Sequence, residues 1–285
     1  MTVTIRPARP EDAEICGTIC YEAFNHIAGK HGFPPDFRSA DIAIGAMSMF
    51  LTRSDVYALV AETGGRIIGS CFLWETCAIA GIGPITVSPA DQDSGAGRRL
   101  MDAVLLRVAE KGAPGVRLVQ SAYHSRSLSL YTRLGFDARE PLSVIQGEPI
   151  GISIPGHPVR KASTDDVAAC NRLSIAVHGH ERFGEIQDAA GQGTLIVVEH
   201  DGRLTGYSTT VGFFGHSVGE TNNDIKALVA ASPGFAGMGF LLPTRNSDLF
   251  RWCLAHGLRV VQPMTLMSRG LYNQPDGAFL PSIIF

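Results

Sequence analysis

The stretch "ITVSPADQDSGAGRRLMDAVL", residues 85–105, decides how this chain is interpreted. It predicts an apolar strand, a proline, a short loop with two glycines, and then an amphipathic helix. Small residues just before a helix N-terminus let backbone N–H groups converge on an anion, and the helix dipole adds partial positive charge there. The stretch therefore indicates either a phosphate-binding loop or an ordinary helix start.

Two familiar phosphate loops are excluded. A Walker loop ends in Gly-Lys-Ser/Thr, whereas Gly97 is followed here by Arg98 and Arg99. The dinucleotide fingerprint needs a third glycine where Leu100 stands, and it follows the first strand of its domain. What remains is a Gln-x-x-Gly-x-Gly pattern that begins at Gln92.

Composition sets limits on the class of protein. The chain has 285 residues, 45% of them hydrophobic and 18% charged, which predicts a globular protein of one large or two medium domains. The formal charge of −3 gives no support for nucleic-acid or anionic-membrane binding. Charges near the start interrupt any secretory signal, and prolines break the longest uncharged stretch, residues 227–244. We expect neither a nucleic-acid nor a membrane partner.

The six cysteines form no C-x-x-C pair and no cluster with zinc spacing. We therefore expect reduced, mostly structural thiols in a cytoplasmic protein, and no metal site.

The two halves of the chain begin alike. "IRPARPEDAEIC" (5–16) matches "VRKASTDDVAAC" (159–170), each a strand that enters a capped helix. "VYALVAETGGRIIGS" (56–70) matches "TLIVVEHDGRLTGYS" (194–208), each a β-hairpin pattern. A repeat of this size indicates two copies of one domain. The Gly- and Pro-rich segment around residues 146–158 marks the seam, so we predict domains at 1–147 and 158–285 joined by a linker at 148–157.

Within the first half, strands and helices alternate in a way that predicts a mixed sheet flanked by helices. The expected elements after the first strand and helix are a helix near 41–52, strands at 57–62, 66–74 and 79–87, a helix after the glycine loop, a strand at 115–122, a helix at 126–135 and a last strand.

Two motifs together resemble one family. "V-x-P-x-x-Q-x-x-G-x-G" runs from Val87 to Gly97, and "LYTRLGF" follows at 130–136. The chain here resembles the GCN5-related N-acetyltransferase (GNAT) family over about residues 3–147. The second half resembles the same fold only in its hairpin and starting helix. The resemblance implies an α/β (α+β) protein of two tandem acetyltransferase-like domains, each a mixed, mostly antiparallel sheet flanked by helices, with a degenerate second copy.

The resemblance implies acetyl-CoA as the acyl donor. Strands 82–87 and 116–121 would splay apart, with the pantetheine arm between them and the pyrophosphate on amides of residues 93–98. The implied donor-binding residues are Ile85, Thr86, Val87, Gln92, Asp93, Ser94, Gly95, Ala96, Gly97, Arg98, Arg99, His124 and Ser127.

In similar enzymes a tyrosine at the position of Tyr131 protonates the departing thiolate, and the alternative is a tyrosine that only packs on the sheet. Two positions depart from the family pattern. His124 replaces the usual asparagine, and the charge of Asp93 would oppose a pyrophosphate unless it points to solvent, with Arg98 and Arg99 offsetting it.

The general base is poorly marked. Glu75 is our candidate because it ends a strand near where an amine could reach; Glu22, His26 and His124 are others. Each could equally be an ordinary solvated side chain, and a water relay makes a single base unnecessary.

The segment "FNHIAGKHGFPPDF" (24–37) has no regular period and is predicted to be a loop. Its aromatic side chains either shape an apolar acceptor pocket or anchor the loop to the core. The predicted substrate residues are Phe24, His26, Phe33 and Phe37.

The second half lacks a convincing donor site. "GFAGMG" (234–239) is followed by an apolar segment and Pro243, which favours a turn between two elements. The residue corresponding to Tyr131 is not a tyrosine. This half could complete the acceptor pocket, dimerise the chain or extend the sheet.

The sequence thus favours an acetyl-CoA-dependent N-acetyltransferase acting on the primary amine of a small molecule, with homodimers possible. Two alternatives remain: a catalytically silent acyl-CoA-binding sensor, and an enzyme whose chemistry lies in the second half.

Overall fold

A computed structural model describes residues 2–284. Its elements follow the alternation expected from the sequence. The strands are β1 (Thr4–Pro7), β2 (Val56–Thr63), β3 (Arg66–Trp74), β4 (Ile79–Val87), β5 (Gly115–Ser121), β6 (Asp137–Gln146), β7 (Val159–Lys161), β8 (Ile196–His200), β9 (Arg203–Ser208), β10 (Ser217–Gly219), β11 (Phe240–Pro243), β12 (Arg259–Gly270) and β13 (Ala278–Leu280). The α-helices are α1 (Ala13–Lys30), α2 (Ala40–Thr52), α3 (Ala96–Glu110), α4 (Ser125–Arg133), α5 (Val167–His178), α6 (Phe183–Gln192), α7 (Asn222–Ala231) and α8 (Ser247–Ala255).

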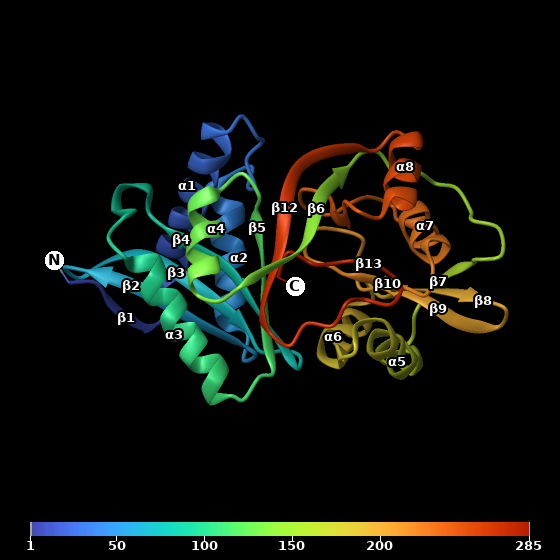
Figure 1. Ribbon diagram of the computed structural model, residues 1–285, viewed down its shortest axis with the longest axis horizontal. Coiled ribbons are helices and arrows are strands. Elements are labelled where there is room, and N and C mark those ends of the chain that lie inside the picture. The colour runs from blue at the N-terminus through green and yellow to red at the C-terminus, as the bar shows by residue number, and fades with distance from the viewer. Residues whose placement is uncertain (1, 285) are drawn as a thin grey trace.

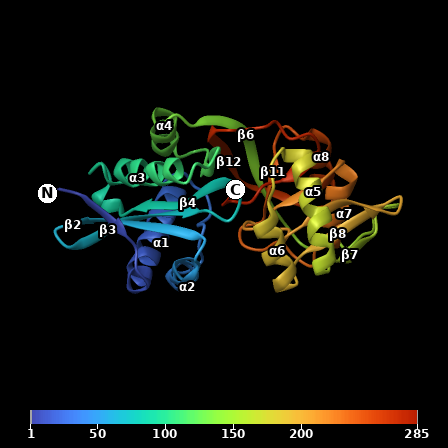
Figure 2. The same cartoon turned by 90° about the horizontal axis from the view of Figure 1, so that it is seen from below.

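Each half of the chain is a sheet covered by helices on both faces. In the first half α1 and α2 lie on one face and α3 and α4 on the other (Figures 1 and 2). In the second half α5 and α6 lie opposite α7 and α8 (Figure 1). The strands form an eight-stranded sheet in the order β1-β2-β3-β4-β5-β12-β6-β11 and a five-stranded sheet in the order β13-β10-β9-β8-β7.

The two halves exchange strands at their junction. β12, from the second half, lies between β5 and β6 of the first, and β6 in turn lies between β12 and β11. All three of these pairings are antiparallel, and the β5–β12 pairing runs from Gly115↔Gly270 to Ser121↔Met264. Since backbone hydrogen bonds tie the halves together along three strand pairs, the two predicted domains share one continuous sheet.

The internal repeat is visible in contacts as well as in sequence. Arg6 on β1 donates to Asp12 (2.7 Å) at the start of α1 and to Glu62 (2.8 Å) on β2. The corresponding residues of the second half, Arg160, Asp166 and Glu199, make the same pair of contacts at 2.8 and 2.7 Å. In both copies this network fixes the turn from the first strand into the first helix, which explains why these sequence positions match.

The expected gap between β4 and β5 is present and positions the site. These parallel strands pair only at Ile79↔Gly115, Ala80↔Val116 and Gly81↔Arg117, and then diverge. The divergence starts after Gly81 and Arg117, so the predicted segment 82–87 of β4 is unpaired with β5 throughout, whereas Val116 and Arg117 of the predicted segment 116–121 are still paired. A bulge against β3 between Cys71 and Leu73 turns the end of β4 further.

One local prediction was wrong. Residues 24–30 continue helix α1 instead of forming a loop, so that Phe24 and His26 are helical. The irregular segment is only 31–39, between α1 and α2. Among residues 2–284, no helix has both the length and the apolar character needed to cross a bilayer.

Truncating the exchanged strand tests whether the halves fold together. Met267 on β12 is fully buried in the core of the first half, alongside Leu118 and Phe136. Met267→Ala should lower the free energy of unfolding by about 2–5 kcal/mol because it leaves a cavity. Denaturant unfolding followed by fluorescence should keep a single transition.

Val260→Ala, on the same strand but 46% exposed, is the matched control and should change the stability by less than about 0.5 kcal/mol. Two separate transitions, with Met267→Ala shifting only one of them, would contradict a shared core.

Candidate active site

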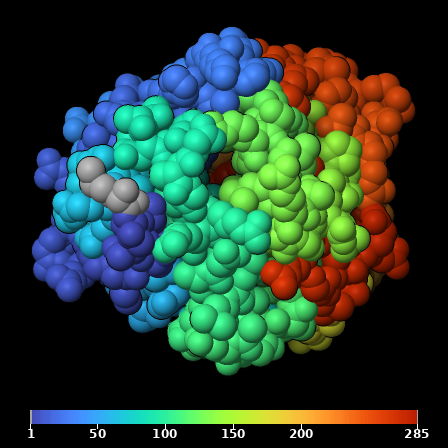
Figure 3. All heavy atoms as spheres, turned by 60° about the vertical axis from the view of Figure 1, so that its left-hand side comes forward, coloured from blue at the N-terminus to red at the C-terminus, as the bar shows by residue number. Residues whose placement is uncertain are grey.

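A cavity of about 610 Å³ opens between the end of β4, the N-terminus of α3 and helix α4. Its mouth is the hollow between the teal and the green atoms in Figure 3. Every predicted donor-binding residue except Arg99 lines it. The Arg99 side chain instead reaches across to the Val3 carbonyl at 2.7 Å.

The loop before α3 presents unused backbone donors to this cavity. The N-cap, Gly95, has φ +83°, a conformation that favours glycine, and it provides no side-chain cap. The Ser94 hydroxyl accepts from the Ala96 amide at 3.3 Å, and the Arg99 amide donates to the Gly95 carbonyl at 3.1 Å. Within residues 2–284, the amides of Gly97 and Arg98 donate to no protein acceptor. Free N–H groups at a helix N-terminus suit a phosphate.

The end of β4 offers a second row of unused backbone groups. The Ser88 amide donates to the Ile68 carbonyl, and Thr86 pairs with Ser70. Because antiparallel pairing alternates, the peptide groups of Ile85 and Val87 face away from β3, into the gap left by β5. An extended amide-containing arm such as pantetheine can pair with this edge. Cavity size, loop donors and strand edge therefore all fit acetyl-CoA, which when bound supplies an activated acetyl thioester.

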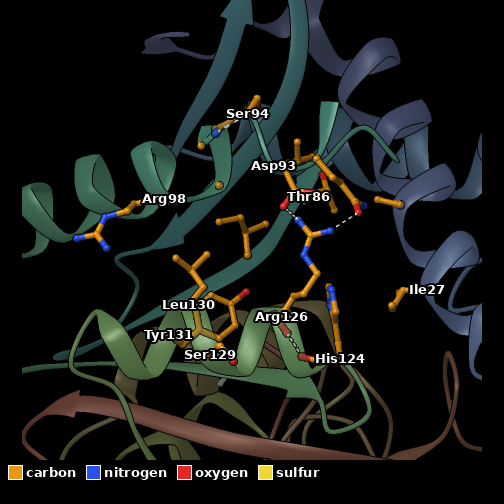
Figure 4. Close-up of a pocket in the computed structure, with 18 of the residues that line it drawn as sticks. Ile27, Thr86, Asp93, Ser94, Arg98, His124, Arg126, Ser129, Leu130 and Tyr131 are labelled. Atoms are coloured by element: carbon orange, nitrogen blue, oxygen red, sulfur yellow. Dashed lines mark hydrogen bonds and ion pairs between the residues drawn. The ribbon is translucent and has the colours of Figure 1, made fainter. Parts of the chain in front are cut away.

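The charge of Asp93 is offset by a residue that the sequence analysis missed. The Asp93 side chain is 83% exposed, and Arg126 on α4 donates to it at 2.7 Å and to Gln92 at 3.1 Å. Figure 4 shows Arg126 extending from α4 to the loop across the cavity mouth. The predicted partners act elsewhere, since Arg98 lies 3.5 Å from Asp102. Arg126 therefore brings a positive charge from α4 to the loop before α3.

Helix α4 directs Tyr131 into the site. The residue is 6% exposed and packs in the core of the first half, with its ring 6.2 Å from that of Phe136. Burial raises its pKa well above the ordinary value, so the phenol stays protonated. Figure 4 shows its side chain pointing from α4 into the cavity.

His124 is the residue just before α4, and it also faces the cavity. Burial, reinforced by the charge of Arg126, lowers its pKa below the ordinary value, so the ring is neutral at pH 7. Its carbonyl accepts from the Ser127 hydroxyl at 2.9 Å, and that hydroxyl also lies 3.0 Å from Gln120. Gln120 is 5% exposed, and its Nε2 has no protein partner within residues 2–284.

A second, apolar cavity of about 210 Å³ adjoins the first. The residues that line both are Phe24, Ile27, Ile85, His124, Ser127 and Tyr131. Both halves of the chain build its walls. The second half contributes Phe213, Phe214, Gly237, Met238, Met264, Ile283 and Ile284. An acceptor in this cavity would lie next to the donor site, with Tyr131 at the junction.

Two of the four predicted substrate residues line this apolar cavity. They are Phe24 and Phe37, whose rings lie 6.2 Å apart. Phe33 instead stacks on Tyr123 at 4.3 Å, and His26 lines neither cavity.

The position of Glu75 does not support a catalytic base. It lines neither cavity, and its carboxylate accepts from Arg107 at 2.8 and 3.1 Å and lies 3.8 Å from Lys111. Glu75 is thus held by Arg107 on α3 and by Lys111 just after it, outside both cavities. Of the other candidates, Glu22 and His26 also lie outside both cavities.

The second half closes the equivalent donor site in two ways. Only Glu220 and Thr221 separate β10 from α7, and the helix start is capped: the Thr221 amide and hydroxyl each lie 2.8 Å from the buried Asp224 carboxylate. Strand β13 then pairs antiparallel with the free edge of β10. A carboxylate at the helix start and a strand in the gap exclude a phosphate and a pantetheine arm. The "GFAGMG" segment is a connection between α7 and β11, as the sequence favoured.

Comparison with known proteins agrees with this geometry. A family model described as the acetyltransferase (GNAT) domain matches residues 54–138. These residues form a GNAT acetyltransferase domain. The matched residues are thus similar to an acetyltransferase domain whose family uses acetyl-CoA as the acetyl donor. No curated protein matches the chain.

Solved structures extend the likeness in fold to the whole chain. A candidate acetyltransferase from Pyrococcus horikoshii superposes with a TM-score of 0.71 at 16% identity, over 97% of this chain and 94% of that one. A GCN5-related N-acetyltransferase from Sphaerobacter thermophilus gives 0.62 at 13% identity, over 95% and 96%. A tandem GNAT protein from the clavulanic acid biosynthesis pathway gives 0.56 at 13% identity, over 94% and 98%. The chain thus has the tandem GNAT fold.

One donor site per chain is the first consequence to test. Isothermal titration with CoA should give one site per chain. Gly97→Glu should raise the Kd for CoA at least about 100-fold, because it places a carboxylate among the free amides. A tenfold change in Kd corresponds to about 1.4 kcal/mol of binding free energy. The Cβ has room, with Val87 and Leu130 at 3.7 and 3.8 Å, and an acidic residue suits a helix start, so the fold should be kept.

Gly234→Glu is the matched control, because it alters the similar motif of the second half at a position with open space. It should leave CoA binding unchanged. Two sites per chain, or equal effects of the two variants, would contradict a single donor site.

Proposed function

We propose that the chain transfers an acetyl group from acetyl-CoA directly to the primary amine of a small molecule, with the chemistry in the first half. The observation that carries the proposal is the junction of the two cavities, where Tyr131, His124 and Ile85 line both. Donor and acceptor can therefore meet without a covalent enzyme intermediate. A sensor that only binds the donor has no need of a second cavity at this point.

In the proposed reaction, a neutral amine attacks the thioester carbonyl, a C–N bond forms and the C–S bond breaks. The nitrogen gives up a proton to solvent, and the leaving sulfur gains one. The exposed amides at the end of β4, near Val87, are placed to stabilise negative charge on the carbonyl oxygen.

Tyr131 would serve the leaving group. A phenol is a weaker acid than a thiol, and burial raises the pKa of Tyr131 further. Complete proton transfer before bond cleavage is therefore unfavourable. We propose that Tyr131 acts as general acid through the hydrogen bond that it donates to the sulfur as negative charge develops there. Its proton moves to the sulfur as a solvent proton replaces it on the phenol oxygen, so no free tyrosinate forms.

Removing this hydroxyl tests the role. Tyr131→Phe should lower kcat about 100-fold while leaving the KM for acetyl-CoA within about twofold, because the hydroxyl acts mainly in the transition state. The assay measures CoA thiol released from acetyl-CoA in the presence of an amine panel.

Tyr57→Phe, a change on β2 outside both cavities, is the control and should be silent. An unchanged rate in Tyr131→Phe would move the chemistry to another group or to the second half. CoA binding without thiol release across the panel would favour the sensor instead.

A further inference from the structure

The second cavity, in which the acceptor is proposed to bind (the acceptor cavity), contains one carboxylate in a mostly apolar lining. Asp36, in the segment between α1 and α2, lines it together with Phe37, Ile42, Met47 and other apolar side chains. No lysine or arginine of residues 2–284 lines this cavity, and its remaining titratable groups, His124 and Tyr131, lie at the junction with the donor site.

A single residue of the second half holds this carboxylate. The Gln262 Nε2 on β12 donates to Asp36 Oδ1 at 3.2 Å. The Tyr123 hydroxyl donates to Gln262 Oε1 at 3.3 Å, which fixes the amide so that its NH₂ group faces Asp36. Gln262 is fully buried. Asp36 is thus oriented by a neutral amide, and no cation pairs with it among the described residues.

An unpaired carboxylate in an apolar cavity is electrostatically costly unless the ligand brings a positive charge. The same lining repels an anion, since it supplies no compensating cation. It also disfavours a polyhydroxylated acceptor, because few polar groups line the walls.

We propose that the acceptor is a cationic amine with an apolar body, such as an arylalkylamine, and that Asp36 binds its ammonium group in the cavity shared by the two halves. This inference rests on the proposed function and names its substrate class. The ammonium that binds Asp36 is the reacting amine, and it loses one proton to solvent before the neutral nitrogen attacks the thioester carbonyl. Gln262 acts as a positioning residue that holds Asp36 toward the ligand. Burial raises the pKa of Asp36 to about 6, so the carboxylate remains mostly ionised at pH 7.5 even before a cation arrives.

The substrate class is tested with two matched pairs in the thiol-release assay. Phenylalaninamide and phenylalanine differ by a carboxylate, and kcat/KM should fall at least about 100-fold for the acid, because the cavity holds no cation to pair with it. 2-Phenylethylamine should exceed ethanolamine by at least about tenfold, because only the former fills the apolar walls.

The role of Asp36 is tested with Asp36→Asn. It should raise the KM for 2-phenylethylamine about 10- to 100-fold, which is the loss expected for a charge-assisted hydrogen bond. The Kd for CoA should not change. Asp41→Asn, an exposed carboxylate on α2 outside the cavity, is the matched control and should have no effect.

A double-mutant cycle separates positioning from structural damage. Gln262→Leu alone should raise the KM less than Asp36→Asn does, and it should add nothing in the Asp36→Asn background. Additive effects would mean that Gln262 does not act through Asp36, and would overturn that part of the proposal.

Failures of the two proposals can be told apart. Amine binding is measured by calorimetry in the presence of CoA, independently of turnover. Binding of 2-phenylethylamine that depends on Asp36, without thiol release, would support this inference and overturn the proposed function. Turnover that favours anionic or polyhydroxylated amines, or that ignores Asp36→Asn, would overturn this inference and leave the proposed function standing.

Discussion

The pairing of β12 with both β5 and β6 is the constraint on which the rest of the structure depends. Each half places one strand inside the other, so the sheet that supports the donor site is completed from the second half. The same strand carries Met264 and Gln262 to the acceptor side. The second half is thus a structural part of the site, although its own donor site is closed. Backbone hydrogen bonds along three strand pairs also make the separate movement of one half unfavourable.

The two halves resolve the same structural problem in opposite ways. In each, a strand edge and the start of the following helix leave backbone donors without partners. In the second half, the Asp224 carboxylate accepts from the Thr221 amide and hydroxyl at the start of α7, and β13 pairs with the edge of β10. In the first half the edge of β4 and the amides of Gly97 and Arg98 are left for a ligand. Unsatisfied backbone groups cost stability, and this cost is tolerated where a ligand offsets it. The difference between the halves therefore favours the first half as the place where the donor binds.

The sequence predicted those features that depend on local patterns. The glycine loop, the amphipathic α3 and the hairpins are set by residues close in the chain, and the predicted strands at 57–62, 66–74 and 79–87 lie where β2, β3 and β4 are found. The strand exchange was not predictable, because β12 has the same apolar pattern whether it pairs with its own half or the other. Asp36 was missed for the same reason: its significance comes from Gln262, far away in sequence. The contacts of Glu75 could not be predicted either, because a strand end near a cleft does not reveal that Arg107, about three turns into α3, holds the carboxylate.

The two cavities take their walls from different parts of the chain, and this bears on substrate specificity. The donor cavity is lined entirely by the first half: by β4, the loop before α3, α3, α4 and, at its edge, α1. The acceptor cavity takes much of its wall from the second half, including Phe213, Met238 and Ile283. Changes in those side chains can reshape the acceptor cavity without touching the amides that hold a phosphate or the hydroxyl of Tyr131. Under the proposed function, a second half whose equivalent donor site is closed is therefore free to vary as a specificity element, provided that β12 continues to complete the sheet. Under the proposed function, this tandem architecture would separate the selection of the amine from the chemistry of acetyl transfer.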